Sequence, residues 1–318
     1  MPPPPTALNN STRGILTLCL GVAVFSMQDL VIKLISGEYP VHQALVLRSL
    51  TAFPVLFAIV AYEGGLRTLI TSGWRVLLVR GLIMFTAYTS YYLGLAALPM
   101  ATCVSLYFTA PLFITLLSVF FLGETVDAPR WIALIAGFVG VLIVVKPGTA
   151  GFDWGMLLPI YAGFSYGLSM VMARWLGGRE SASVMATYGN VVFLAGALAL
   201  AAVFASGAHA NEAHKSLAFL MRGWAMPTTR DTLLMMSCGI VAGLGLVLLT
   251  QAYRVAEASV VAPFEYTGLI WSVLLGFLVW NEWPDAVSWF GIAIIIAAGL
   301  FILHREREVK RRRAAQAA

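Results

Sequence analysis

The segment TLLSVFFLGETVDAPRW at residues 115–131 recurs in similar form, 158 positions later, as VLLGFLVWNEWPDAVSW at residues 273–289. The same offset, without a gap, aligns Gly81 with Gly239, Thr109 with Thr267, Leu116-Leu117 with Leu274-Leu275, Glu124 with Glu282, Asp127 with Asp285, and Trp131 with Trp289. A duplicated unit in a membrane protein is typical of transporters, whose solute site lies between the copies near the bilayer midplane. The repeat therefore predicts two related halves with a candidate site between them.

The composition is that of an integral membrane protein. Of the 318 residues, 60% are hydrophobic and 11% are charged, and the mean hydropathy is +0.85. A soluble domain carries about 25% charged residues, so this chain has too few polar groups to cover a surface in water. Cys19, Cys103 and Cys238 lie in apolar stretches without a CxxC pair or a nearby histidine. They predict neither a disulfide framework nor a metal site, and no cofactor is expected.

Ten apolar segments are long enough to cross a bilayer, for which a helix needs about 17–25 apolar residues. The expected spans are 14–35, 41–62, 76–97, 100–122, 131–147, 154–176, 183–205, 231–253, 258–280 and 287–304. The first segment is too long for the core of a signal peptide, so we expect it to be a retained helix. The predicted fold is an all-α integral membrane protein with ten transmembrane helices.

The distribution of basic residues predicts the orientation, because lysine and arginine gather on cytoplasmic loops. With the N-terminus inside, the inside set is Arg13, Arg67, Arg75, Arg80, Arg130, Arg174, Arg179, Arg254 and the tail at 305–313. The outside set is Lys146, Lys215, Arg222 and Arg230. Both termini are therefore expected in the cytoplasm.

The odd number of spans in each half determines how the halves are related. Since five helices end on the opposite side from where they began, the second half must be inverted relative to the first. The expected division is a disordered lead at 1–13, repeats at 14–147 and 154–304, and a basic tail at 305–318. Because the tail directly follows a span, it is expected to contact anionic lipid rather than nucleic acid.

Several short motifs resemble one transporter family. Phe121-Leu122-Gly123-Glu124 ends one apolar segment, Val279-Trp280-Asn281-Glu282 ends its copy, and alanine-rich stretches at 96–101 and 255–259 precede the fourth and ninth helices. From Gly14 to Leu303 the chain resembles the drug/metabolite transporter superfamily, and within it the EamA-type ten-helix carriers, although Asn281 stands where glycine is usual. The resemblance implies a carrier of small organic metabolites in a bacterial inner membrane. The chain has no phosphate-binding loop, so we expect secondary transport rather than ATP-driven transport.

Four ionisable residues inside the expected spans qualify as functional candidates. They are Asp29, Lys33, Arg48 and Glu265, with Gln28 beside the first. A charge within a span costs about 2.5–3.5 kcal/mol on insertion scales, so such residues normally face a cavity and have a partner. Asp29 and Lys33 are four residues apart and can pair on one helix face. They are predicted to bind substrate or a proton; the alternative is a structural ion pair.

Glu265 is the strongest of these candidates. It follows Pro263, which removes a backbone donor and breaks a helix. A carboxylate beside a broken helix is suited to a coupling proton or a cation, whereas the alternative is a structural pair with Arg48. Arg48 could also meet an anionic group of the substrate or extend to the lipid headgroups.

Aromatic residues are dense in the helices that would line the cavity. The group comprises Tyr88, Tyr91 and Tyr92, Tyr107 and Phe108, and Tyr266 and Trp271. Aromatic faces suit planar heterocycles and organic cations. As a group they favour a substrate larger than an ion, although any one of them could instead face lipid.

Glu124 and Glu282 end helices of opposite orientation, and their repetition indicates matching gates or helix caps on the two sides of the membrane. We favour a structural role for both.

Gly163-Phe164-Ser165-Tyr166-Gly167 matches the G-x-S-x-G nucleophile motif, which requires a strand–turn–helix and a histidine within reach. In an expected span these residues are better interpreted as a small-residue packing face, like Gly239 and Gly243.

The sequence therefore predicts a non-enzymatic secondary transporter of a small organic metabolite. Uptake of riboflavin or S-adenosylmethionine fits the expected cavity. The alternatives are an exporter of amino acids or drugs, an intramembrane enzyme and a membrane scaffold. The expected partners are the substrate and membrane lipid, and the sequence leaves a homodimer open.

Overall fold

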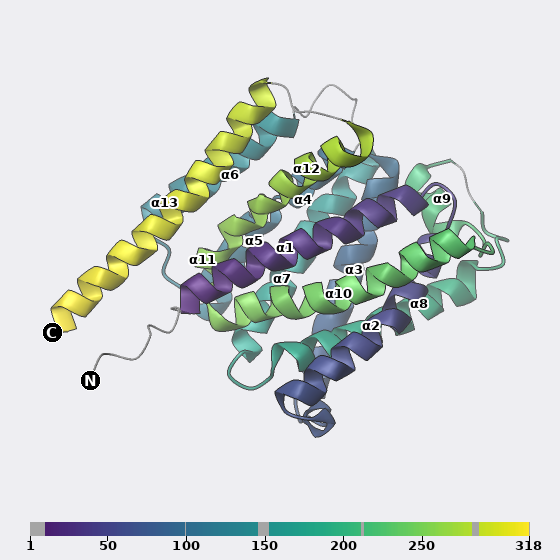
Figure 1. Cartoon of the computed structure of the whole chain (residues 1–318), viewed down its shortest axis with the longest axis horizontal. Helices are drawn as coiled ribbons and strands as arrows, with labels where there is room; N and C mark the ends of the chain where they lie inside the picture. Colours follow the sequence, from purple (N-terminus) through teal and green to yellow (C-terminus); the bar gives the residue numbers. More distant parts are fainter. Residues whose placement is uncertain (1–9, 99, 146–152, 211–212, 282–285, 318) are drawn as a thin grey trace.

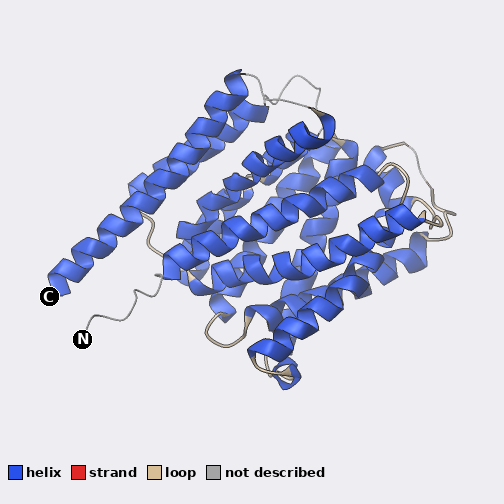
Figure 2. Cartoon of the chain, in the orientation of Figure 1, coloured by secondary structure: helices blue, strands red, loops and turns tan. Residues whose placement is uncertain are grey.

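Helices joined by loops make up the part of the chain that the computed structural model describes, residues 10–98, 100–145, 153–210, 213–281 and 286–317, and these ranges contain no strand (Figure 2). In these ranges seven helices are long and apolar enough to cross a membrane: Asn10–Ile35, Val41–Glu63, Trp74–Ala97, Trp154–Leu176, Ala182–Phe204, Thr229–Val255 and Ala262–Val279. Shorter apolar helices lie at Ala110–Leu122, Ala128–Ile143 and Trp289–Phe301. The predicted all-α membrane class is confirmed. Lipid offers no hydrogen-bond partners to backbone N–H and C=O groups, and a helix satisfies these groups by hydrogen bonds within its own segment.

The elements follow in the order α1 (Asn10–Ile35), α2 (Val41–Glu63), η1 (Leu66–Leu69), α3 (Trp74–Ala97), α4 (Met100–Tyr107), α5 (Ala110–Leu122), α6 (Ala128–Val145), η2 (Trp154–Met156), α7 (Leu157–Leu176), α8 (Ala182–Phe204), α9 (Lys215–Met221), α10 (Thr229–Val255), α11 (Ala258–Val261), η3 (Ala262–Thr267), α12 (Gly268–Trp280) and α13 (Ala286–Ala317).

Helices from the two parts of the sequence alternate in the bundle. α1 and α2 both pack on α10, α3 packs on α7 and α8, and α5 packs on α7. α6 and α13 pack on each other at the edge of the bundle, where Figure 1 shows them side by side. Because early helices contact late ones rather than each other, the core between them contains side chains from both halves of the sequence.

The expected span at 100–122 is two helices rather than one. α4 ends at Tyr107 and α5 begins at Ala110, so Phe108 and Thr109 interrupt the helix. Pro111 follows in the first turn of α5. Since proline lacks an N–H group, it cannot continue the hydrogen bonds of the preceding turn.

The expected span at 258–280 is broken at the equivalent position. The 3₁₀ segment η3, Ala262–Thr267, separates α11 from α12 and contains Pro263. Glu265 and Tyr266 lie in this break, 158 positions after Tyr107 and Phe108. The two copies of the repeat therefore both place irregular backbone at the level of the candidate site.

Helix boundaries differ from the expected ones at both ends of the chain. α1 begins at Asn10 rather than at residue 14, and α13 continues through the basic tail to Ala317 rather than ending at 304. The apolar pattern marks the part of a helix that suits lipid, whereas alanine, lysine, arginine and glutamate continue a helix into water.

The long connection between α8 and α10 contains the short helix α9, which was not expected. The side-chain amide of Gln43 exchanges hydrogen bonds with the backbone of Ala225, at 2.7 and 3.1 Å. His214 Nε2 lies 3.0 Å from Asp153 Oδ1, and this hydrogen bond holds the pKa of Asp153 below its usual range. These contacts fasten the connection to the end of the bundle.

The predicted small-residue packing faces are confirmed. A Cβ atom at Gly239 would lie 1.8 Å from Thr51 Oγ1 and 2.2 Å from the Arg48 carbonyl oxygen, so α10 meets the backbone of α2 at this position. At Gly163 the nearest backbone atom would be the carbonyl oxygen of Tyr107, at 3.1 Å. Small residues allow such close approach between membrane helices.

Replacing Gly239 tests this contact. We expect Gly239→Ala to lower the free energy of unfolding by about 3 kcal/mol, the upper end of the overpacking range, because the backbone of α2 cannot move aside as a flexible side chain can. The measurement is the melting temperature of the purified protein in detergent.

Gly189→Ala is the matched control, since a Cβ atom there would meet nothing within 4 Å. It should leave stability unchanged or raise it by up to about 1 kcal/mol. Equal melting temperatures for the two variants would contradict the proposed contact.

Candidate functional site

Helices from both halves surround a cavity of about 70 Å³ in the described part of the chain. Its lining comes from seven elements: α1, α3, α4, α7, α10, η3 and α12. Six of the predicted residues line it, namely Asp29, Tyr88, Tyr91, Tyr107, Phe108 and Glu265. The structure therefore brings together residues that are up to 236 positions apart in the sequence (29 to 265).

The two carboxylates of the cavity have different environments. Glu265 Oε1 accepts hydrogen bonds from the hydroxyls of Tyr166, at 2.7 Å, and Tyr253, at 2.9 Å. Asp29 Oδ2 accepts one longer hydrogen bond, from Tyr91 at 3.4 Å. Glu265 is therefore held firmly in a buried site, and Asp29 keeps more capacity to accept hydrogen bonds.

Arg48 does not pair with Glu265, so the structural alternative for that carboxylate is wrong. Arg48 Nε donates to Gln28 Oε1 at 2.9 Å, and Gln28 Nε2 donates in turn to the Tyr92 hydroxyl. Arg48 is fully buried, which also excludes the alternative that it extends to the headgroups. Gln28, Arg48 and Tyr92 thus form a chain of hydrogen bonds behind the cavity wall.

The guanidinium of Arg48 stacks on aromatic rings. Its Cζ lies 4.8 Å from the centroid of Phe193 and 5.7 Å from that of Tyr88. A cation over an aromatic face is attracted by the ring quadrupole, more strongly where water is excluded. Tyr88 also lines the cavity, so Arg48 contacts a residue of the cavity wall.

The alternative for Asp29 and Lys33, a structural ion pair between them, is wrong. Lys33 Nζ donates instead to the carbonyl oxygen of Leu95 at 3.0 Å. The two side chains share a helix face, but tyrosine and backbone groups from α3 supply nearer partners. Lys33 therefore links α1 to the end of α3.

Tyrosine rings form a continuous aromatic wall along the cavity. Tyr107 lies between Tyr91, at a centroid distance of 4.9 Å, and Tyr166, at 5.7 Å. Tyr88 contacts Tyr166 edge to face at 6.5 Å. Such a wall can hold a planar heterocycle or an organic cation.

Three predicted aromatic residues lie outside the lining. Tyr92 is fully buried and bonded to Gln28. Tyr266 is buried and packs edge to face on Phe108 at 5.8 Å, so it supports the wall from behind. Trp271 is only partly buried and packs against the main core.

Sequence reasoning missed Tyr166, Tyr253 and Arg80. Tyr166 lies within the G-x-S-x-G match, and its neighbour Ser165 is buried in the middle of helix α7, without the strand–turn–helix that a nucleophile requires. Arg80 was assigned to the cytoplasmic set, but its side chain is buried and donates to Ser169 O at 3.0 Å and Thr250 Oγ1 at 3.2 Å. The sequence signal that could have identified Arg80 as a buried residue was its position, the seventh residue of helix α3.

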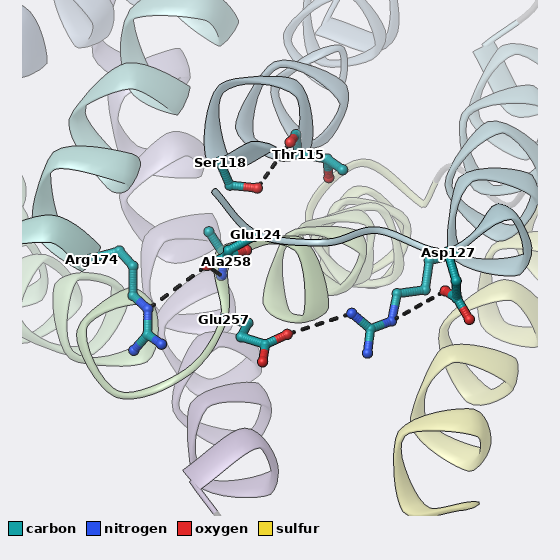
Figure 3. A network of polar contacts seen from close by, with 8 residues as sticks. Thr115, Ser118, Glu124, Asp127, Arg174, Glu257 and Ala258 are labelled. Atoms are coloured by element: carbon teal, nitrogen blue, oxygen red, sulfur yellow. Dashed lines mark hydrogen bonds and ion pairs between the residues drawn. The ribbon is translucent and has the colours of Figure 1, made fainter. Parts of the chain in front are cut away.

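Glu124 joins the two halves of the sequence at one end of the bundle. Its Oε1 accepts from the backbone N–H of Ala258 at 3.0 Å and lies 3.8 Å from Arg174 Nε (Figure 3). Nearby, Arg130 lies 3.5 Å from Glu257 and 3.6 Å from Asp127. The structural role expected for Glu124 is supported by this geometry, whereas Glu282 lies outside the described residues.

A multi-pass helical bundle with an acidic, aromatic cavity between broken helices defines the chain as a secondary transporter of a small metabolite. The model of the EamA-like transporter family matches residues 12–146 and, a second time, residues 153–304. The chain belongs to this family. The resemblance noted in the sequence is thereby confirmed.

Three relatives show the range of proteins to which the chain is similar. It is 31% identical over 302 residues to an S-adenosylmethionine uptake transporter of Rickettsia bellii, covering 95% of this chain and 97% of the relative. It is 32% identical over 241 residues to a riboflavin transporter of Rhizobium johnstonii, covering 75% and 73%. A pseudopaline exporter of Pseudomonas aeruginosa is 28% identical over 288 residues, with 90% and 94% covered.

The fold is also found in a solved structure, titled "Crystal structure of protein". The match has a TM-score of 0.74 at 17% identity and covers 92% of this chain and 98% of that one.

Substitutions at Glu124 test its role at the end of the bundle. We expect Glu124→Ala to destabilise the protein by about 1–3 kcal/mol, because the N–H of Ala258 loses its acceptor. Glu124→Gln keeps an acceptor oxygen and loses only the charge, so its melting temperature should lie between those of Glu124→Ala and wild type. Equal melting temperatures for all three proteins would contradict the assignment.

Proposed function

We propose that the chain crosses the membrane ten times, as two inverted five-helix repeats at 14–147 and 154–304. The crossings are α1, α2, α3, α4 with α5, and α6, followed by α7, α8, α10, α11 with α12, and α13. Two observations support this: the family model matches twice, and both copies have a broken fourth helix. Both termini then lie in the cytoplasm, and the inner membrane of a bacterium is the expected location.

The observation that carries the proposed function is the cavity that both halves line. Asp29 comes from α1 and Glu265 from η3, and tyrosines of α3, α4 and α7 lie between them. Its volume of about 70 Å³ is well below the 300–1,000 Å³ of sites that hold a drug-sized ligand. The halves must therefore move apart before substrate enters, as alternating access requires.

The ion pairs around Glu124 suit one closed side of this cycle. They connect α5 and α6 of the first half to α7 and α11 of the second. Opening of that side separates these partners, so the contacts stabilise the closed arrangement. With the N-terminus inside, this is the cytoplasmic end.

The substrate class is a small metabolite with a planar heterocycle, and S-adenosylmethionine is the first candidate. Its sulfonium and ammonium groups suit Asp29 and the tyrosine faces, and its adenine suits the aromatic wall. Riboflavin is the second candidate, because the wall also fits a neutral planar ring. Uptake is the proposed direction; export of amino acids or drugs is the competing one, and one relative is an exporter.

Glu265 is the proposed coupling residue. Its carboxyl group is buried beside a helix break and is bonded to two tyrosine hydroxyls. A charged carboxylate is costly inside the membrane, so the protonation state of Glu265 can be linked to the conformation of the bundle. Asp29 accepts only one long hydrogen bond, from Tyr91, and is therefore available to bind the cationic part of the substrate.

Replacing Glu265 by Gln tests the coupling. We expect proteoliposomes with the variant to lose uptake driven by an imposed proton gradient, at least tenfold, because no proton can be bound and released at this position. Exchange of substrate across the membrane should remain, since the amide oxygen still accepts from Tyr166 and Tyr253.

Glu38→Gln is the matched control, because Glu38 is an exposed carboxylate in the turn between α1 and α2 and does not line the cavity. It should retain gradient-driven uptake. Full gradient-driven uptake by Glu265→Gln would overturn the coupling role, and a scaffold protein would show no uptake with any variant.

A ligand screen tests the substrate class. A compound that binds only the folded state stabilises it by mass action and so raises the melting temperature. At a ligand concentration of 100 times Kd, the free energy of unfolding increases by about 2.7 kcal/mol. We expect S-adenosylmethionine to stabilise the protein in detergent and Tyr107→Ala to weaken this effect. If only amino acids or drugs stabilise it, the exporter alternative is favoured.

A further inference from the structure

The guanidinium of Arg48 is held at one edge and unpaired at the other. Nε donates to Gln28 Oε1, but Nη1 and Nη2 are buried and have no hydrogen-bond partner among the described residues. No acidic side chain in that part of the chain lies within 4.0 Å of it. Stacking on Phe193 and Tyr88 offsets part of the desolvation of the cation but supplies no acceptor.

Arg80 shows that burial in this bundle does not by itself leave an arginine unpaired. It is equally enclosed, at 2% exposure, yet its Nε and Nη2 donate to the Ser169 carbonyl and the Thr250 hydroxyl. The two unpaired nitrogens are therefore a particular property of Arg48. A buried donor without an acceptor destabilises the protein, so this site is expected to receive one during function.

The position of Arg48 connects it to the cavity. Its guanidinium lies over Tyr88, whose ring lines the cavity together with Asp29. Movement of the Tyr88 ring as the cavity widens would bring the guanidinium within reach of the substrate. The cavity would then present a carboxylate on α1 and a guanidinium on α2.

We propose that Nη1 and Nη2 of Arg48 form a subsite for the carboxylate of a zwitterionic substrate, whose cationic group meets Asp29. The paired N–H donors of a guanidinium match the two oxygens of a carboxylate, and hydrogen bonds between two charged groups are the stronger kind. This inference rests on the proposed function and deepens it. It favours an amino-acid-bearing substrate such as S-adenosylmethionine over riboflavin, which has no carboxylate.

The experiment compares two ligands that differ in one group. Dissociation constants of S-adenosylmethionine and its decarboxylated analogue are measured on the full-length protein in lipid nanodiscs. Wild type should bind S-adenosylmethionine about 10- to 100-fold more tightly, the range for hydrogen bonds to charged groups. Arg48→Lys should lose at least tenfold for S-adenosylmethionine and little for the analogue, because lysine lacks the planar fork.

Arg80→Lys is the matched control: a buried arginine is replaced in the same way, so any loss should be equal for both ligands. Gln28→Glu is a second variant that keeps the acceptor for Arg48 Nε and adds a competing negative charge. It should also weaken S-adenosylmethionine selectively, and it tests the subsite if Arg48→Lys does not fold. The melting temperature of each variant without ligand monitors folding.

The outcomes separate this inference from the proposed function. Equal affinity of wild type for both ligands, or equal losses for both in the Arg48→Lys and Gln28→Glu variants, would overturn the carboxylate subsite and leave the transporter proposal standing. Binding of riboflavin alone would do the same. A folded protein that binds none of the three compounds would overturn the subsite and the proposed substrate class together.

Discussion

Backbone N–H and C=O groups find no water in the hydrocarbon core of a bilayer, and the rest of this structure depends on that constraint. Nearly every segment satisfies it by remaining helical. The breaks at Phe108-Thr109 and at η3 are therefore informative, because irregular backbone is tolerated at that depth only where it is buried in protein or lines a cavity. Both breaks lie at the cavity, and the second carries Glu265.

The charged groups inside the bundle mostly have neutral partners. Glu265 is bonded to two tyrosine hydroxyls, Arg80 to a carbonyl and a hydroxyl, and Lys33 to a carbonyl. An internal ion pair would compete with a charged substrate, whereas a dipolar partner stabilises a charge without neutralising it. The cavity thus keeps its acidic character, and Asp29 and Arg48 retain bonding capacity toward a ligand.

Close packing between the halves couples the cavity wall to helices of both halves. α10 meets the backbone of α2 at Gly239, and α7 meets Tyr107 at Gly163, so the broken fourth helix rests on a helix of the other half. Glu124 adds a charged contact between the halves at one end. The proposed motion of one half against the other would therefore reach the aromatic wall through these contacts.

The sequence alone determined the membrane class, the repeat and the family, because each is written in local patterns: apolar length, a constant offset, and short motifs. It also identified Asp29 and Glu265, because a charge inside a span is costly and conspicuous, and it identified Tyr88, Tyr91, Tyr107 and Phe108 from the density of aromatic residues in the expected spans. Only the tertiary structure decided which groups meet. Asp29 and Lys33 are suitably spaced to pair, yet each has a partner on α3. Tyr166 and Tyr253 gave no strong local signal, and the position of Arg80 inside an expected span did not reveal its partners. Helix spacing determines which residues share a face but not which neighbouring helix that face meets.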